Sequence, residues 1–347
     1  MDGNYNAISA KLQAMYSNHL TDNDFKQLLE KKSVNDICAY LKNDTAYAEV
    51  LSGVDERDAH RGHLEFVLKQ KMLSEYMRMY QFIDLKKRNI LKFWWMRHEI
   101  EYLKRSIRYI FNHEKQVDDV IDQQNKDFFM EHTKIDWEAL AHAKTFSDCV
   151  KACENTPYAD VLARAENLNA DLFSVGMLLD SYYYVSLWRA KDLLLDKEGA
   201  KIFETLIGPT IDMLNMTWIY RGIKYFHFDK ELIYTYLIPV RYLLTEEMII
   251  GMVEAESPEA MSLIAQKTRY APLFDGVEDG FFVEENYRRM MNQRAKSVFV
   301  NHPRSMAAVF AYFNLQEVEI FNVTMVIEGI RYSLNTDFIR QHVRIEA

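Results

Sequence analysis

The chain has 347 residues, 49% of them hydrophobic, with only 11 glycines and 6 prolines. Such a sequence can bury a sizeable core and is not disordered, and the scarcity of the two helix-breaking residues predicts an all-α protein. The formal net charge of −9 argues against nucleic-acid binding, which needs a basic surface, and against electrostatic docking on anionic lipid.

The sequence gives no sign of targeting or membrane insertion. The start, MDGNYNAISAKLQ, lacks the apolar core of a secretory signal, and glycine stands at position 3 rather than at the myristoylated position 2. No run of 18 apolar residues is free of charges, so no helix is expected to span a membrane. The three cysteines, Cys38, Cys149 and Cys153, form no disulfide framework and fit a reducing cytosol. We therefore expect a cytoplasmic protein. If it works at a membrane, a partner protein has to hold it there.

Helical patterns run through the chain in order. Thr21 and Ser33 are expected to cap two short helices, because a hydroxyl accepts a hydrogen bond from a free N–H of the first turn. Apolar residues then recur at helical spacing over 63–80, 172–195 and 281–298. The segment 318–330 is apolar around much of its circumference, which predicts a buried helix. Helix stops are expected at four prolines, Pro209, Pro239, Pro258 and Pro272.

One short motif occurs three times. Its form is T-x-Y-A followed by two apolar positions, and the three copies begin at Thr45, Thr156 and Thr268. Their tyrosines, Tyr47, Tyr158 and Tyr270, are 111 and 112 residues apart. Two nearly equal intervals indicate an internal repeat, which has to be recognised before the fold is interpreted.

A second motif repeats in step with the first. In each copy an acidic residue precedes Asn or Tyr by three positions, and an arginine follows. The members are Glu99, Tyr102 and Arg108 in the first copy, Asp212, Asn215 and Arg221 in the second, and Glu319, Asn322, Glu328 and Arg331 in the third. The two motifs are 55, 57 and 52 residues apart within the three copies. We therefore predict three helical repeats, at 1–115, 116–230 and 231–347.

The repeated polar residues have two interpretations. They are either structural, with carboxylate, amide and arginine satisfying one another or a helix end inside each repeat, or they form a binding site built three times. The structural interpretation is favoured, because threefold polar groups in apolar helices usually solve one packing problem three times.

Recognisable catalytic motifs are missing from the sequence. It contains no phosphate-binding P-loop, no GxGxxG and no G-x-S-x-G nucleophile elbow. His60 and His63 are three apart and His98 precedes Glu99, but none of these belongs to a four-ligand metal pattern. We therefore expect no catalytic site, no cofactor and no bound metal, with a metal-dependent helical enzyme as a competing hypothesis.

Three stretches together resemble a known family, namely 41–47, 211–221 and 317–331. They are similar to the C subunit of the bacterial and archaeal V/A-type ATPases (ATP synthases), whose eukaryotic counterpart is the d subunit of the vacuolar ATPase. The resemblance runs nearly end to end and is most specific from Glu319 to Arg331. Tyr102 departs from the pattern, because the other two copies have asparagine there.

The resemblance implies a fold, partners and a role. The implied fold is three similar helical bundles around a pseudo-threefold axis, forming a funnel. The implied partners are the central-stalk subunits D and F and the membrane rotor ring, which the protein would join on the cytoplasmic face of the membrane. It would thereby couple ATP synthesis or hydrolysis to proton or sodium transport without a catalytic site of its own, and would be monomeric when isolated. The alternative is a helical-repeat scaffold for an unrelated protein partner.

Overall fold

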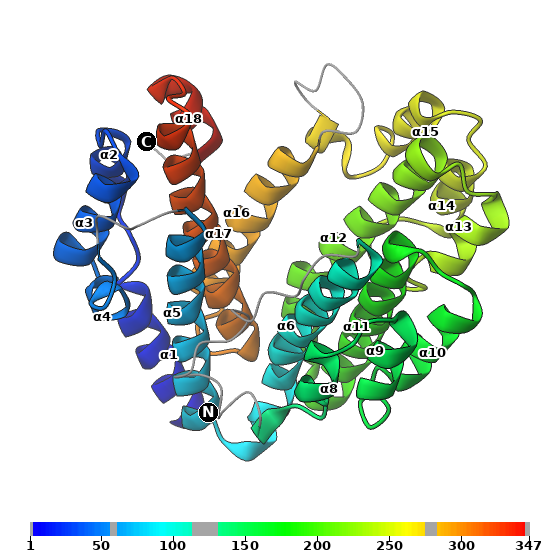
Figure 1. The fold of residues 1–347 in the computed structure, drawn as a ribbon, viewed down its shortest axis with the longest axis horizontal. Helices are drawn as coiled ribbons and strands as arrows, with labels where there is room; N and C mark the ends of the chain where they lie inside the picture. The colour runs from blue at the N-terminus through cyan, green and yellow to red at the C-terminus, as the bar shows by residue number, and fades with distance from the viewer. Residues whose placement is uncertain (1–2, 56–60, 113–130, 275–282, 344–347) are drawn as a thin grey trace. The chain divides into compact units, whose positions relative to one another are not determined.

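The computed structural model describes residues 3–55, 61–112, 131–274 and 283–343 (Figure 1). Over these ranges the secondary structure consists of helices, without a strand, which confirms the predicted all-α class. The chain divides into two compact units. The first contains residues 1–84 and 289–347, and the second contains residues 85–288.

The first unit is organised around one long helix, α17 (Met306–Arg331). α17 packs against α1 (Gly3–Tyr16), α2 (Asp22–Leu29), α3 (Val34–Asp44), α5 (Arg61–Phe82) and α18 (Thr336–Val343). The short α4 (Ala48–Leu51) links α3 to α5, and most of α16 (Glu284–Asn301) also belongs to this unit. Buried residues occur all round α17, which confirms the predicted buried helix at 318–330.

The two predicted caps in the first unit are present. The Thr21 hydroxyl accepts a hydrogen bond from the Asp24 N–H at 3.2 Å, and the Asp24 carboxylate accepts one from the Thr21 N–H at 2.7 Å. This reciprocal pair is a capping box. Ser33 accepts from the Asp36 N–H at 3.1 Å. The predicted helix at 63–80 lies within α5.

The second unit contains three long helices and several short ones. The long helices are α6 (Leu85–Phe111), α11 (Leu172–Leu194) and α12 (Lys197–Arg221), and α11 packs against both of the others. The remaining elements are α8 (Trp137–Ala141), α9 (Phe146–Ala152), α10 (Ala159–Asn167), the π-helical turn η2 (Gly222–Phe226), α13 (Lys230–Tyr236), α14 (Glu246–Val253), α15 (Pro258–Ala265) and the 3₁₀ turn η3 (Ala271–Phe274). The helix predicted at 172–195 is α11. Of the helix predicted at 281–298, the first two residues lie outside the described ranges and residues 284–298 lie in α16.

The helix stop expected at Pro209 is wrong, because Pro209 lies inside α12. Proline there has no N–H to offer the carbonyl of Thr205, which costs helix stability. The helix persists because Ile207, Gly208 and Ile211 around it are all buried, and tertiary packing outweighs intrinsic propensity. The other three prolines lie outside α-helix interiors, with Pro258 at the first position of α15.

Gly329 allows α18 to approach the C-terminal end of α17 closely. A Cβ at this position would lie 2.4 Å from Cδ1 and 2.5 Å from Cγ1 of the buried Ile339. We expect Gly329→Ala to lower the free energy of unfolding by about 1–3 kcal/mol through overpacking, measured by denaturant titration. Gly176→Ala in α11 is the control, because its Cβ meets nothing within 4 Å and it should stabilise by up to about 1 kcal/mol. Equal effects of the two substitutions would contradict the packing argument.

Candidate functional site

The two repeated motifs meet in the structure, three times over. In each case the tyrosine hydroxyl of the first motif donates a hydrogen bond to the acidic side chain of the second. The bonds are Tyr47–Glu319 at 2.5 Å, Tyr158–Glu99 at 2.6 Å and Tyr270–Asp212 at 2.9 Å. All six side chains are buried. A buried carboxylate needs hydrogen-bond donors, and the tyrosine supplies one in every copy.

These bonds join different predicted repeats rather than closing within one. Tyr158 reaches back to the acid of range 1–115, Tyr270 reaches back to that of 116–230, and Tyr47 bonds to that of 231–347. The expectation that the polar groups satisfy one another inside each repeat is therefore wrong for the carboxylates. Spacing alone could not reveal this, because Tyr158 is nearly as far from Glu99 (59 residues) as from Asp212 (54 residues). The three ranges themselves stay a prediction.

The threonine of the first motif shapes the turn that presents the tyrosine. In all three copies its hydroxyl donates to a backbone carbonyl at the C-terminal end of the preceding helix and accepts from the N–H of the tyrosine. The carbonyls are those of Leu41, Cys153 and Ala265, at 2.6, 2.6 and 2.7 Å. The tyrosine N–H bonds measure 3.2, 3.1 and 3.1 Å. The T-x-Y order of the motif is thus explained by a side-chain turn.

Asp212 and Asn215 clasp a loop against α12. The Asp212 carboxylate accepts hydrogen bonds from the N–H groups of residues 242, 243 and 244 at 3.1, 2.6 and 3.2 Å. The Asn215 side chain donates to the Ile238 carbonyl at 3.1 Å and accepts from the Ile238 N–H at 2.8 Å. Both side chains are fully buried. Burial raises the pKa of Asp212, and these donors partly oppose that rise. The contacts favour the structural interpretation of this copy.

The first copy replaces the asparagine clasp with aromatic packing. Tyr102 is half-buried, and its ring meets Trp137 edge-on at 6.1 Å between centroids. Burial raises the pKa of Tyr102 and also that of its neighbour Glu99. The space that an amide fills in the second copy is therefore filled by an aromatic ring in the first.

The arginines of the second motif lie away from its carboxylates. Arg108, Arg221 and Arg331 are exposed, with Arg221 3.4 Å from Glu284 and Arg331 over the ring of Tyr332 at 5.3 Å. The expected pairing of arginine and carboxylate within the motif is therefore wrong. The two groups are nine positions apart in the first two copies, which is about 13 Å along a helix axis and beyond side-chain reach. In the third copy Glu328 instead pairs with Arg61 at 3.1 Å.

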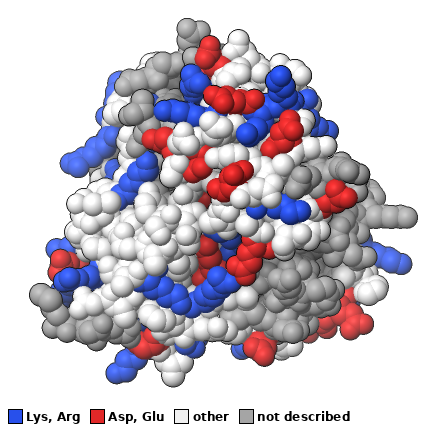
Figure 2. All heavy atoms as spheres, turned by 90° about the vertical axis from the view of Figure 1, so that its left-hand side faces the viewer, with Lys and Arg blue, Asp and Glu red and all other residues white. Residues whose placement is uncertain are grey.

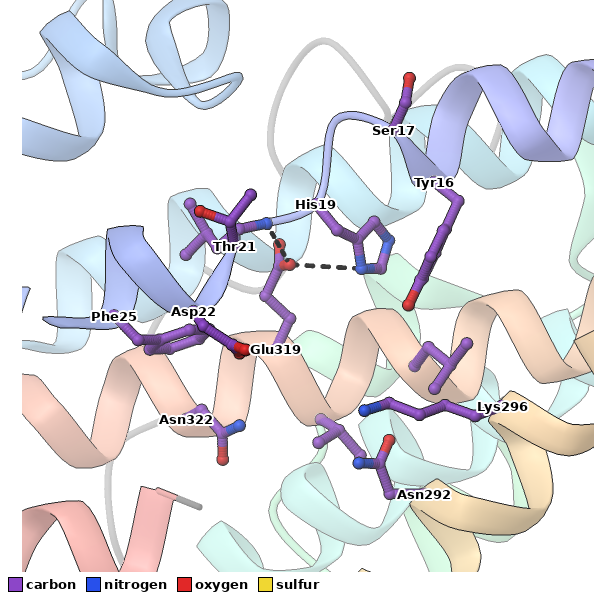
Figure 3. Close-up of a pocket in the computed structure, with 13 residues that line it drawn as sticks. Tyr16, Ser17, His19, Thr21, Asp22, Phe25, Asn292, Lys296, Glu319 and Asn322 are labelled. Atoms are coloured by element: carbon purple, nitrogen blue, oxygen red, sulfur yellow. Dashed lines mark hydrogen bonds and ion pairs between the residues drawn. The ribbon is translucent and has the colours of Figure 1, made fainter. Parts of the chain in front are cut away.

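The third copy opens onto a cavity of about 470 Å³ in the first unit (Figure 3). Besides Tyr47, the Glu319 carboxylate accepts the Leu20 N–H at 2.7 Å and lies 3.2 Å from Nδ1 of His19. Asn322 lines the cavity and is half-buried, unlike its counterpart Asn215. Burial raises the pKa of Glu319 to about 7, and burial also lowers the pKa of His19 to about 4.

A second buried carboxylate stands behind this cluster. Glu75 on α5 accepts hydrogen bonds from the Tyr312 hydroxyl at 2.5 Å and the Gln316 amide at 2.6 Å, and it pairs with Lys71 at 2.9 Å. Sequence reasoning missed Lys71, Glu75 and His19. The available signal was a charged pair four residues apart within the apolar stretch 63–80, whereas His19 lies in a link without any periodicity.

The candidate metal ligands and the cysteines form no recognisable reactive site among the described residues. Within the described ranges, no group of three or more His, Cys, Asp or Glu side chains is placed to hold a metal ion. His60 lies outside those ranges. Cys149 and Cys153 are buried, and burial raises the pKa of each thiol to about 12. Among the described helices, none has the length and apolarity needed to cross a lipid bilayer.

The sequence pattern of the ATP synthase (C/AC39) subunit family matches residues 8–342. The chain therefore belongs to this family, as the resemblance of its repeated segments predicted.

Three individual relatives have sequence identities of 23–27% to this chain, and each is named as the C subunit of an A-type ATP synthase. That of Thermococcus kodakarensis is 23% identical over 344 residues, covering 98% of this chain and 90% of that protein. That of Pyrococcus furiosus is 24% identical over 355 residues with the same coverage. That of Methanosphaera stadtmanae is 27% identical over 219 residues, covering 58% of this chain and 54% of that one.

Proposed function

We propose that this protein is a non-catalytic rotor subunit of a V/A-type rotary ATPase, joining the central-stalk subunits D and F to the membrane rotor ring. The observation that supports this most is the family match from residue 8 to residue 342. The relatives that align over 98% of the chain carry the name of the C subunit of the A-type ATP synthase. In this role the protein sits on the cytoplasmic face of the membrane, binds no nucleotide and moves no ion itself.

A coupling role requires stiffness. Moving one charge through 100 mV of membrane potential costs roughly 2.3 kcal/mol, so several ions per step load the joint with about 10 kcal/mol. Long buried helices are tied down by Tyr–carboxylate bonds in three places, and tightly packed interiors transmit strain. We propose that the three pairs mark three similar bundles of a funnel around a pseudo-threefold axis, with partners at its two ends.

Surface charge supports docking with a defined register. Figure 2 shows the face of the first unit that carries its N-terminal helices, where Lys and Arg are interspersed with Asp and Glu. Charges of both signs distributed in this way can fix orientation against a partner of complementary pattern. The same face has an area of uncharged side chains among the charges.

The proposal is tested by binding. Purified protein is mixed with the D–F stalk and, separately, with detergent-solubilised rotor ring, and complexes are detected by size-exclusion chromatography with light scattering. We expect a one-to-one complex with the stalk, a complex with the ring, and a monomer when the protein is alone. Binding to neither partner would reject the coupling role in favour of a scaffold for an unrelated protein. Stoichiometric zinc or iron in the purified protein would favour the metal-enzyme hypothesis instead.

A further inference from the structure

One of the three Tyr–carboxylate pairs has a histidine beside its acid. Glu99 and Asp212 accept hydrogen bonds from their tyrosine hydroxyls, and Asp212 also accepts them from backbone N–H groups. Glu319 additionally faces Nδ1 of His19 at 3.2 Å. His19 lies in the link between α1 and α2, and the adjacent Leu20 N–H is bonded to the same carboxylate. This contact therefore holds the N-terminal helices on α17 (Figure 3).

The surroundings of His19 are unfavourable for a positive ring. An imidazolium has two charged N–H donors, and a charged donor buried without an acceptor costs more than a neutral one. Nδ1 has Glu319, but Nε2 is buried and has no hydrogen-bond partner among the described residues. The centroid of the His19 ring lies 4.8 Å from that of Tyr16 and 5.3 Å from that of Tyr312. Burial and the nearby Lys71 both lower its pKa, to about 4.

The surroundings of Glu319 are correspondingly unfavourable for a negative charge. The nearest buried cation, Lys71, is already paired with Glu75 at 2.9 Å and lies over the ring of Tyr47 at 4.7 Å. Burial raises the pKa of Glu319 to about 7, against the opposing effects of Tyr47, Lys71 and the Leu20 N–H. The charge of Glu75 adds to the rise.

Charged and titratable groups reach this cluster from several elements. They are Tyr16 at the end of α1, His19 in the link, Asp22 at the start of α2, Tyr47 before α4, Lys71 and Glu75 on α5, Lys296 on α16 and Tyr312 on α17. Two neighbours of α17 remain: α3, whose buried residues are Ile37, Cys38 and Leu41, and α18, which approaches α17 further along, around Gly329. The buried charges Lys71 and Glu75 are paired with each other, whereas Asp22 and Lys296 reach solvent. Glu319 and His19 are therefore the buried pair between which a proton can be placed.

We propose that closing the α1–α2 link onto α17 moves a proton from His19 to Glu319, so that the link is held with equal strength across mildly acidic pH. In the open link, the exposed imidazolium and carboxylate share one titratable proton, carried on the ring. In the closed link, the N–H bond of the ring is broken and an O–H bond on the carboxyl is formed. The number of bound protons stays the same, and no other reactant is required.

The direction of each contribution follows from linkage. The pKa of Glu319 is raised in the folded protein, so its contribution to closure is full below about 4.5 and is lost as pH rises to about 7. The pKa of His19 is lowered, so its contribution is full above 6.5 and is lost as pH falls to about 4. Between about 4.5 and 6.5 the two slopes are opposite and cancel. When either residue is removed alone, the stability of the closed link should therefore change with pH in the direction set by the residue that remains.

The test is hydrogen–deuterium exchange of the full-length protein, followed by mass spectrometry on peptides that contain Leu20, from about pH 4.5 to 7.5, a range that spans both titrations. Each variant is compared with the wild type at the same pH, which removes the intrinsic pH dependence of exchange. When exchange follows the opening equilibrium, one uncompensated proton changes that equilibrium by up to about tenfold per pH unit.

The expected results differ in sign between variants. In the wild type, the opening equilibrium changes by less than about threefold between about pH 4.5 and 6.5, since the two one-proton slopes cancel. In His19→Gln, opening increases as pH rises; in Glu319→Gln, opening decreases as pH rises. In the double variant, opening does not change with pH. The control Glu317→Gln, which changes a half-buried acid on the same helix, keeps the pH profile of the wild type. Amides 242–244, bonded to Asp212, are an internal control in every sample.

Two results would overturn the proposal. One is that the single variants keep the pH profile of the wild type, and the other is that both single variants change in the same direction. If Glu319→Gln fails to fold, the comparison of His19→Gln with the wild type still tests the proposal. Opening in His19→Gln is independent of pH only when Glu319 does not take up the proton.

Discussion

Asp212→Ala is expected to destabilise the second unit strongly, with the largest loss of any polar substitution in that unit. The carboxylate accepts three backbone N–H groups and the Tyr270 hydroxyl, and alanine leaves these buried donors without an acceptor. Each unsatisfied buried group costs about 1–3 kcal/mol, with partial relief from water that enters the vacated space. We expect a loss of about 3–5 kcal/mol in the free energy of unfolding and a fall of about 10 °C in the melting temperature.

Two controls separate this effect from general sensitivity to substitution. Asp212→Asn keeps the volume and one acceptor oxygen but points an NH₂ group at backbone donors, so its loss should be intermediate. Asp160→Ala removes an exposed acid from the first turn of α10 and should cost below about 1 kcal/mol. Binding to stalk and ring, measured well below the melting temperature, should be retained by Asp212→Ala. Unchanged melting combined with lost binding would show that Asp212 is a partner contact.

The components of the repeated site were predictable from the sequence, but their partners were misassigned. The T-x-Y-A and acidic motifs were recognisable because each copy solves the same local problem, a threonine-shaped turn and a carboxylate inside an apolar helix. Spacing could not show that Tyr158 bonds to Glu99 rather than to Asp212, because chain order is identical in both arrangements. The distance from Glu99 to Arg108, by contrast, could have been worked out, since helix geometry places them about 13 Å apart.

Helix positions were predictable wherever local chemistry decides them. Thr21 and Ser33 cap helices because their hydroxyls reach free N–H groups nearby. At Pro209 local reasoning gives the wrong answer, because α12 continues through this proline with its neighbours buried. The burial of those neighbours depends on the assembled fold and not on the local sequence. His19 was also out of reach, because its role depends on Glu319 of α17, far away in the chain, and no local pattern signals such a contact.

Asn215 and Asn322 occupy the same position of the repeat, yet their substitution should have very different consequences. Asn215 is fully buried and bonds both polar groups of Ile238. In Asn215→Ala these two backbone groups lose their partners, and we expect the free energy of unfolding to fall by about 2–4 kcal/mol. Asn322 is half-buried at the wall of the cavity, where water can replace its contacts. Asn322→Ala should therefore change stability by less than about 0.5 kcal/mol.

The paired measurement distinguishes the two interpretations of the repeated asparagine. If the position is structural, denaturant titration shows a large loss for Asn215→Ala and almost none for Asn322→Ala, and both variants still bind stalk and ring at low temperature. If it is a binding position built three times, the two variants lose partner affinity to a similar extent whatever their stability. Tyr102 in the first copy favours the structural outcome, because its ring packs against Trp137 in place of an amide clasp. A shared binding function would need a common chemical group at all three positions, whereas packing requires only that each local space be filled and its polar groups satisfied.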